Sequence, residues 1–148
     1  MRRVLVTGVT GFAGSHLVDY MAERGDAEIW GIQRWRSRTE NIEHLRDRMT
    51  LVECDLRDAE STRDTIEQVR PDWIFHLAAQ SFVPTSWKAP TESLTTNVLG
   101  QLHLFEADET ATLREKVSSM HVDVTEARQA PGRLRAELRT EVEAVLRA

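Results

Sequence analysis

The sequence predicts an α/β fold, a parallel sheet of about four strands with helices on both faces, followed by a helical C-terminal tail. Three observations predict it. Short apolar segments alternate with segments of helical period as far as about residue 107. Three glycines at regular spacing follow the first apolar segment, and beyond residue 107 the chain becomes more polar. We therefore divide the chain into a domain at residues 1–107 and a tail at 108–148.

The predicted elements alternate along the domain. Strands are expected at residues 3–7, 28–33, 50–55 and 72–77, and helices at 14–24, 40–47, 60–69 and 91–107. Right-handed crossovers between parallel strands give the sheet order 3-2-1-4.

Local signals set the ends of several elements. Ser61 and Asp64 fit a capping box for the third helix. Pro84 and Pro90 are expected to bracket an irregular loop that carries Ser86 and Trp87. The helix after this loop has an apolar stripe at Leu94, Val98, Leu102 and Phe105.

Composition narrows the function classes. With 148 residues, 41% of them hydrophobic and 29% charged, the chain is long enough to bury a core. The net charge of -5 argues against a general nucleic-acid binder. Cys54 is the single cysteine, which excludes an intrachain disulfide and favours a cytoplasmic setting. We expect no signal peptide, because Thr7 and Gly8 interrupt the first apolar run. We expect no membrane span either, because no apolar run is long enough.

The glycine-rich segment indicates a nucleotide site. Gly8, Gly11 and Gly14 stand between a predicted strand and a predicted helix. This strand–turn–helix unit places a dinucleotide pyrophosphate on a helix N-terminus in Rossmann-like folds. Gly8 allows a sharp exit from the strand, Gly11 a close approach of phosphate, and Gly14 close packing of the helix. The alternative is an ordinary glycine-rich turn.

The end of the second predicted strand indicates which dinucleotide binds. An acidic residue there favours NAD, whereas an arginine can pair with the 2′-phosphate of NADP. This chain has Arg34, Arg36 and Arg38 around Ser37, with no acid between Ile29 and Thr39. We therefore expect NADP. The alternative is a solvated basic loop.

Two further strand ends carry candidate residues. Asp55, after the third strand, is placed to accept a hydrogen bond from the adenine amino group, although Asp55 or Asp58 could instead cap the next helix. Ala78 and Ala79 leave room for a cofactor beside the backbone after the fourth strand. His76 lies within an apolar run and is expected to be a hydrogen-bonded core histidine rather than a catalyst.

Several separated motifs resemble one known family. They are residues 7–14, the pair Asp55-Leu56, residues 75–81, Ser86-Trp87, Pro90 and residues 96–100. Together they resemble the extended short-chain dehydrogenase/reductases of the NAD-dependent epimerase/dehydratase family. The resemblance is greatest to the GDP-mannose 4,6-dehydratases, followed by the GDP-4-keto-6-deoxymannose reductases. It covers about residues 1–107.

The resemblance implies an NADP-dependent lyase of nucleotide-sugar metabolism. In that chemistry a hydride leaves C4 of the hexose, water is lost across C5–C6, and the hydride returns at C6. The implied roles are pyrophosphate binding by Gly8, Thr10, Gly11, Phe12, Ala13 and Gly14, 2′-phosphate binding by Arg34 and Arg36, and adenine binding by Asp55 and Leu56. Leu77, Ala78, Ala79, Gln80 and Ser81 would line the nicotinamide-side ribose, Asn97 would brace the cofactor, and Ser81 and Ser86 would lie near the sugar nucleotide.

The chain departs from the family in two ways. The family uses a Tyr-x-x-x-Lys pair for proton transfer, but Tyr20, the one tyrosine, is in the first predicted helix. We therefore assign no catalytic residue, and no metal ligand. We also expect the sugar-nucleotide domain of the family to lie outside these residues. The chain is expected to be an incomplete enzyme, one that a partner chain completes, or a non-catalytic interaction protein.

The tail at residues 108–148 does not resemble the family. Thr112 and Glu115 fit a cap for a helix with Leu113, Val117 and Met120 on one face, and Pro131-Gly132 precedes a last helix. The apolar stripe of that last helix is Leu134, Leu138, Val142, Val145 and Leu146. The tail would cover the edge of the fourth strand or bind a partner chain or a second copy. Alternatively it is the unrelated end of a truncated or frame-shifted product.

Overall fold

A computed structural model describes residues 1–113 of the chain. The chain divides into two units, Met1–Asp108 and one that begins at Glu109. All of the strands among the described residues belong to the first unit. The predicted last helix and the break at Pro131-Gly132 lie outside the described residues.

The first unit contains a four-stranded parallel sheet in the order β3-β2-β1-β4. Its strands are β1 (Arg2–Thr7), β2 (Ala27–Gln33), β3 (Thr50–Glu53) and β4 (Trp73–His76). The strand order and the alternation with helices confirm the predicted Rossmann-like α/β fold. β3 and β4 are shorter than predicted, because Cys54, Asp55 and Leu77 already belong to the loops at the carboxyl edge.

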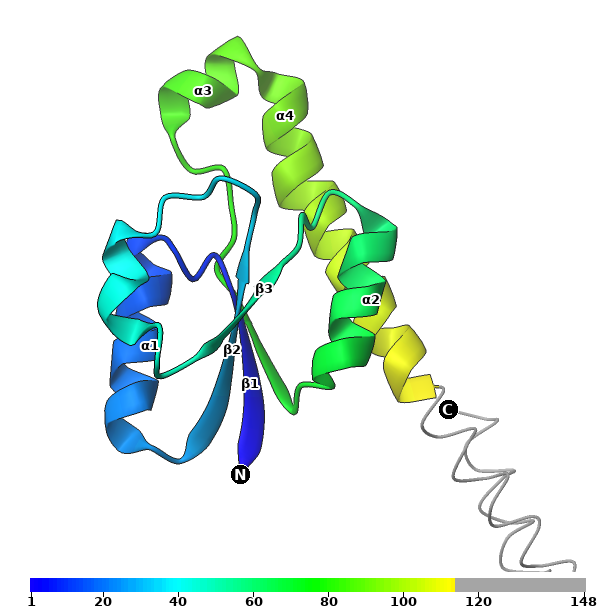
Figure 1. The fold of residues 1–148 in the computed structure, drawn as a ribbon. Helices are drawn as coiled ribbons and strands as arrows, with labels where there is room; N and C mark the ends of the chain where they lie inside the picture. Colours follow the sequence, from blue (N-terminus) through cyan, green and yellow to red (C-terminus); the bar gives the residue numbers. More distant parts are fainter. Residues whose placement is uncertain (114–148) are drawn as a thin grey trace, which may run out of the picture. The chain divides into compact units, whose positions relative to one another are not determined.

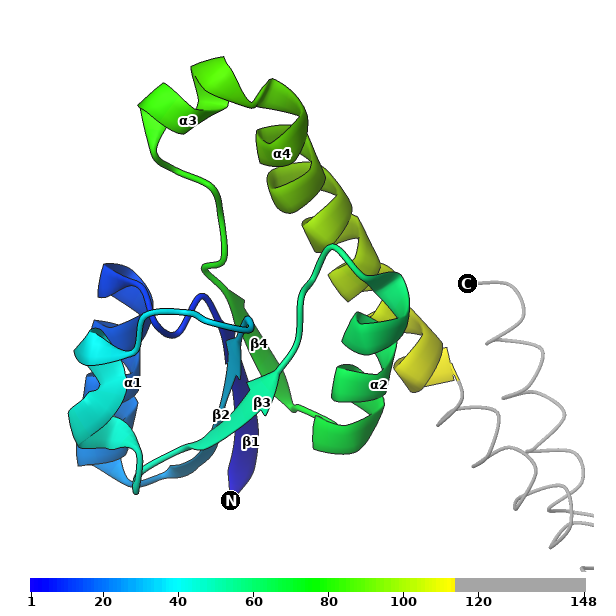
Figure 2. The ribbon, with the colours of Figure 1, turned by 45° about the horizontal axis from the view of Figure 1, so that its top comes forward.

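Helices cover both faces of the sheet (Figures 1 and 2). α1 (Phe12–Arg24) and the 3₁₀-helix η1 (Glu40–Leu45) lie on one face, and α2 (Ala59–Val69) lies on the other. Val4 and Val6 of β1 join the buried core with α1 and η1, whereas Leu5 points to the opposite face. The central strand is thus apolar on both faces, as a covered parallel sheet requires.

The segment after β4 is helical over most of its length. α3 (Val83–Lys88) and α4 (Pro90–Leu94) precede the π-helix η2 (Thr95–Leu99), and residues 100–113 are helical. The predicted irregular loop between Pro84 and Pro90 is therefore wrong. Both prolines stand in the first turn of a helix, where their missing N–H removes no helical hydrogen bond.

Two predicted caps are also wrong. α2 begins two residues before Ser61, and its N-cap is Asp58, whose carboxylate accepts hydrogen bonds from the N–H groups of Glu60 and Ser61. The capping box of Ser61 and Asp64 therefore does not form. Thr112 lies inside a helical stretch that has already begun at residue 100, so it does not start a helix; Glu115 lies outside the described residues.

The apolar stripe on the helix predicted at residues 91–107 is exposed; it begins in α4 and runs through η2 into residues 100–107. Leu94, Val98, Leu102 and Phe105 are 45–64% exposed. Leu104 and Ala107 supply the buried contacts of this helix instead, since both are less than 5% exposed.

A single buried hydroxyl joins the ends of β1 and β4. The Oγ1 of Thr7, which is fully buried, accepts hydrogen bonds from the backbone N–H groups of Leu77 and Ala78, each at 3.1 Å. These two donors occupy the lone pairs of the oxygen, so its own proton points to Nδ1 of His76 at 2.7 Å. We therefore assign His76 as the acceptor at Nδ1. It is hydrogen-bonded as expected, but it is half-buried rather than part of the core.

We predict that acid weakens the fold through His76. Burial lowers the pKa of this imidazole below its ordinary value of 6.5. The unfolded chain therefore binds the proton first, and stability that is present above pH 6.5 is lost as the pH falls toward the native pKa. The His76→Asn variant keeps an acceptor but does not titrate. Chemical denaturation at about pH 8 and about pH 5.5 should show a smaller loss for the variant than for the unsubstituted chain; equal losses would contradict this assignment.

We predict that Gly14→Ala is far more harmful than Gly25→Ala. A Cβ at Gly14 would lie 2.2 Å from the carbonyl oxygen of Gly8, whereas one at Gly25 would meet nothing within 4 Å. The second variant then bears only the penalty of its left-handed backbone, about 1 kcal/mol, and the first about 3 kcal/mol or more. Unfolding free energies from urea titration compare the two variants.

Candidate functional site

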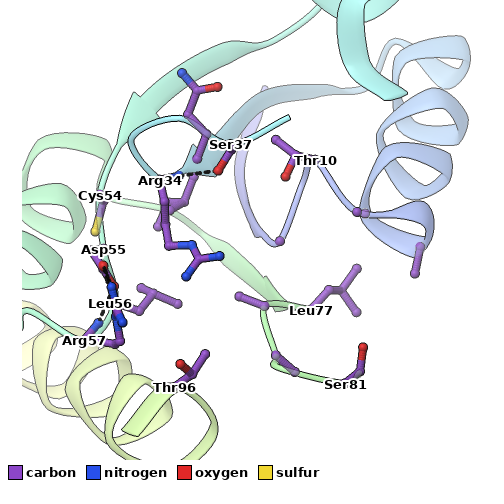
Figure 3. Close-up of a pocket in the computed structure, with 18 of the residues that line it drawn as sticks. Thr10, Arg34, Ser37, Cys54, Asp55, Leu56, Arg57, Leu77, Ser81 and Thr96 are labelled. Atoms are coloured by element: carbon purple, nitrogen blue, oxygen red, sulfur yellow. Dashed lines mark hydrogen bonds and ion pairs between the residues drawn. The ribbon is translucent and has the colours of Figure 1, made fainter. Parts of the chain in front are cut away.

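The loops at the carboxyl edge of the sheet enclose a cavity of about 450 Å³ (Figure 3). Every strand contributes to it, because parallel strands all end at this edge. Most of the residues singled out in the sequence line it. The lining comprises Gly8, Thr10, Gly11, Phe12, Ala13, Gly14, Ile32, Gln33, Arg34, Ser37, Cys54, Asp55, Leu56, Arg57, Leu77, Ala78, Ala79, Ser81 and Thr96.

The glycine loop after β1 is held close to its neighbours. Gly8 has φ +70°, and a Cβ there would lie 2.7 Å from backbone atoms of Leu77 and Ala78. The N–H of Gly11 donates to the carbonyl oxygen of Gly8 at 3.0 Å. Only glycine at position 8 therefore allows the loop to turn away from β1 while it contacts the β4 loop.

The N-terminus of α1 opens onto the cavity without a side-chain cap. Its N-cap is Gly11, no acidic residue stands in the first turn, and Phe12, Ala13 and Gly14 line the cavity. In contrast, Asp58 caps α2. An uncapped helix N-terminus with positive partial charge is suited to bind an anion.

A residue outside the glycine motif supports this loop. Asn41 of η1 donates its side-chain N–H to the carbonyl oxygen of Thr10 at 3.0 Å. This bond connects the segment after β2 to the loop after β1. Sequence reasoning missed it, because nothing in the local pattern indicates which distant carbonyl an asparagine will meet.

Arg34 extends into the cavity from the loop after β2 (Figure 3). The loop closes on itself, since the N–H of Arg34 donates to Oγ of Ser37 at 3.1 Å and the N–H of Ser37 donates to the carbonyl oxygen of Arg34 at 3.0 Å. Arg36, with φ +58°, does not line the cavity, and its guanidinium lies 6.0 Å from the ring centroid of Trp35. The structure thus brings Arg34 and Ser37, but not Arg36, to the cavity.

The loop after β3 contains an ion pair. Nε and Nη2 of Arg57 donate to the carboxylate of Asp55 at 2.5–3.1 Å, and this hydrogen bonding lowers the pKa of Asp55. Asp55 lines the cavity and does not cap α2, whereas Asp58 does. Leu56 beside it is fixed from the helix after α4: His103 Nδ1 lies 2.9 Å from its carbonyl oxygen.

Asn97 holds the loop after β4. Its Oδ1 accepts the N–H of Gln80 at 2.7 Å, and its Nδ2 donates to the carbonyl oxygen of the same residue at 3.1 Å. Neither residue lines the cavity itself, but Ala79 and Ser81 on either side of Gln80 do. Asn97 lies in the π-helix η2, and its neighbour Thr96 lines the cavity.

Of the two serines expected near a sugar nucleotide, only one lies at the cavity. Ser81 lines the cavity, whereas Ser86 lies in α3 and donates its hydroxyl to the carbonyl oxygen of Val83 at 3.0 Å. Five lining residues had been given no site role from the sequence: Ile32, Gln33, Cys54, Arg57 and Thr96. For Arg57, its position directly after Asp55-Leu56 at a strand end was an available signal.

The described residues show neither a metal cluster nor a phenol at the cavity. Within residues 1–113 no group of three or more His, Cys, Asp and Glu side chains is arranged to hold a metal ion. Tyr20 lies in α1, where its hydroxyl accepts a hydrogen bond from Arg24 at 3.2 Å. In the same part of the chain, no helix has both the length and the apolar character needed to cross a membrane.

Two solved structures share this architecture. UDP-glucose 4-epimerase from Thermus thermophilus, solved in complex with NAD, superposes with a TM-score of 0.67 at 34% identity, over 74% of this chain and 34% of that one. UDP-glucose 4-epimerase from Thermotoga maritima, solved with UDP-glucose, has a TM-score of 0.66 at 34% identity and the same coverage.

Sequence relatives agree with the structural ones. A CDP-glucose 4,6-dehydratase of Salmonella typhimurium is 39% identical over 108 residues, which are 71% of this chain and 30% of that protein. A GDP-mannose 4,6-dehydratase of Yersinia enterocolitica is 32% identical over 116 residues, 72% of this chain and 31% of the relative. The chain thus spans about a third of the length of the curated relatives it matches.

A family model described as GDP-mannose 4,6 dehydratase matches residues 5–126, well over half of the chain. The match extends past residue 107, so the expectation that the whole tail is unlike the family is wrong for residues 108–126. The family model, the sheet order, the glycine loop and the sequence relatives all indicate the same family. The chain belongs to the GDP-mannose 4,6-dehydratase family, within the NAD-dependent epimerase/dehydratase group of short-chain dehydrogenase/reductases.

Proposed function

We propose that the first unit binds NADP in the cavity at the carboxyl edge, as the cofactor-binding part of a nucleotide-sugar dehydratase that resembles GDP-mannose 4,6-dehydratase. The observation that carries the proposal is the pairing of two features in one cavity. An uncapped helix N-terminus lies beside the glycine loop, and Arg34 enters from the neighbouring strand end. Together they suit a ligand with a pyrophosphate and a further phosphate.

The pyrophosphate is assigned to the loop after β1. Gly8, Thr10, Gly11, Phe12, Ala13 and Gly14 all line the cavity. A side chain at Gly8 or Gly14 would collide with neighbouring backbone, so glycine at these positions lets the loop pack closely. Backbone N–H groups at a helix N-terminus are the usual donors to such a group.

The 2′-phosphate is assigned to Arg34, with Ser37 beside it. β2 ends at Gln33 rather than at an acid, so no carboxylate of this strand end competes for the ribose hydroxyls or repels a phosphate. Arg36 belongs to this proposal as well, although it must turn away from Trp35 to reach the same phosphate.

The remainder of the cofactor is assigned to the loops after β3 and β4. Asp55 and Leu56 would hold the adenine, and residues 77–81, braced by Asn97, would line the ribose on the nicotinamide side. The chemistry that bound NADP supplies in this family is reversible hydride transfer at the sugar. The residues of this chain bind and orient the cofactor, and none of them is proposed as the catalytic acid or base.

The substrate proposed from the family is a nucleotide sugar such as GDP-mannose, close to Ser81 and Ser86. A partner polypeptide that supplies the catalytic tyrosine and lysine is the alternative, in which the assembly acts as a reductase or epimerase. The exposed stripe at Leu94, Val98, Leu102 and Phe105 favours such a partner. A non-catalytic interaction protein is the third candidate.

The proposal is tested by calorimetric titration of the purified chain with NADPH and, separately, NADH. Binding of NADPH in preference to NADH would support it, whereas absence of binding to both would favour the interaction protein. Incubation with NADP and GDP-mannose then measures turnover. Turnover by the purified chain would show that the catalytic groups lie within it and contradict our assignment of none.

We predict that Arg34→Ala lowers the affinity for NADPH about ten- to hundredfold and changes that for NADH little, because a charge-assisted bond to phosphate is lost. Arg38→Ala, which removes the same charge from the same loop outside the cavity lining, is the control. Calorimetry measures the affinities of the unsubstituted chain and of both variants for each cofactor. An equal loss for both cofactors in Arg34→Ala would place the 2′-phosphate elsewhere.

We predict that Asn97→Ala weakens both cofactors by a similar factor of about ten, because the two bonds to Gln80 position a loop that NADP and NAD share. Thr95→Ala removes a hydroxyl that bonds only within its own helix and is the matched control. A selective loss of NADPH in Asn97→Ala would contradict this role.

A further inference from the structure

Asp55 lies between two arginines at one end of the cavity. Arg57 is bonded to it directly, and Arg34 lines the same cavity and lowers the pKa of the Asp55 carboxyl through its positive charge. Figure 3 shows Arg34 extending into the cavity beside Asp55 and Leu56, from the end of the neighbouring strand. Two guanidinium groups are therefore within the electrostatic reach of one carboxylate.

Arg57 alone occupies that carboxylate. Oδ1 accepts from the backbone N–H of Arg57 at 3.1 Å and from its Nε at 3.0 Å. Oδ2 accepts from Nε at 3.1 Å and from Nη2 at 2.5 Å. A carboxylate offers about four acceptor positions, so these contacts leave little capacity for a second guanidinium.

Arg34 is correspondingly left without an ion pair among residues 1–113. Its backbone is fixed by Ser37, and its side chain is exposed within the cavity. An arginine near a free carboxylate normally forms a bidentate ion pair with it. Such a pair here would occupy the group that is proposed to bind the 2′-phosphate.

We propose, on the basis of the proposed NADP function, that Arg57 is a positioning residue that holds Asp55 away from Arg34 and so keeps Arg34 free for the 2′-phosphate. Arg57 then sets the preference for NADPH over NADH without touching the phosphate. The alternative, direct contact between Arg57 and the phosphate, predicts a different response to removal of Asp55.

The experiment compares the Arg57→Ala chain with the unsubstituted chain by titration with NADPH and NADH. Released from Arg57, Asp55 pairs with Arg34, and the affinity for NADPH falls about fivefold while that for NADH is nearly unchanged. Arg63→Ala is the matched control, because Arg63 has a similarly exposed side chain and an ion pair with Glu60 outside the cavity. Thermal unfolding checks that both variants are folded.

The double variant Asp55→Asn with Arg57→Ala decides between the two roles. Asparagine cannot form the competing ion pair, so the preference for NADPH should return to that of the unsubstituted chain. In an Arg34→Ala background, Arg57→Ala should leave the ratio of the two affinities unchanged. The asparagine leaves an acceptor for adenine, which NADPH and NADH share, so the ratio reports only on the phosphate.

Three results would overturn the inference. They are an equal loss of both cofactors in Arg57→Ala, no recovery of the preference in the double variant, and a persistent effect of Arg57→Ala without Arg34. Failure of the unsubstituted chain to bind either cofactor would overturn the proposed function itself, and the inference with it. These outcomes are distinct, since the first three require that the unsubstituted chain binds.

Discussion

The hydroxyl of Thr7 is the contact on which the cavity depends. It lies at the end of the central strand and bonds to two backbone N–H groups and one imidazole of the β4 segment. Those bonds set the distance between the glycine loop and residues 77–78, which is so short that Gly8 has no room for a side chain. A buried hydroxyl with all its bonds satisfied is rigid, and its loss would leave several groups unpaired at once.

The cavity is assembled from loops, but distant helices fix those loops. Asn41 of η1 holds the loop after β1, Asn97 of η2 holds the loop after β4, and His103 contacts the loop after β3. The contact atoms on the loop side are backbone atoms in each case. The loop sequences therefore remain free to carry the groups that face the ligand, while their positions are set by side chains outside the cavity.

The fold could be predicted from the sequence because parallel strands and helices have different apolar periods, and glycine marks the turn after β1. The errors have local causes. Prolines in the first turn of a helix were interpreted as loop residues. Ser61 was interpreted as an N-cap, although Asp58 caps the helix and it begins earlier. For the site, strand ends indicated Arg34 and Asp55, since parallel strands end together. The Asp55–Arg57 pair and the turning away of Arg36 depend on side-chain conformations that no sequence pattern encodes.

The bond between Thr7 and His76 also has a consequence for how the molecule folds. It joins residues 69 positions apart, whereas β1 and β2 pair across a much shorter segment. Closing the longer loop is the greater loss of chain entropy, and long-range parallel pairing is slow. The sheet of β1, β2 and β3 can form before β4 adds to β1, but the cavity cannot. Competence to hold a nucleotide thus arises at the end of folding, and a bound ligand would stabilise only molecules in which β4 has docked.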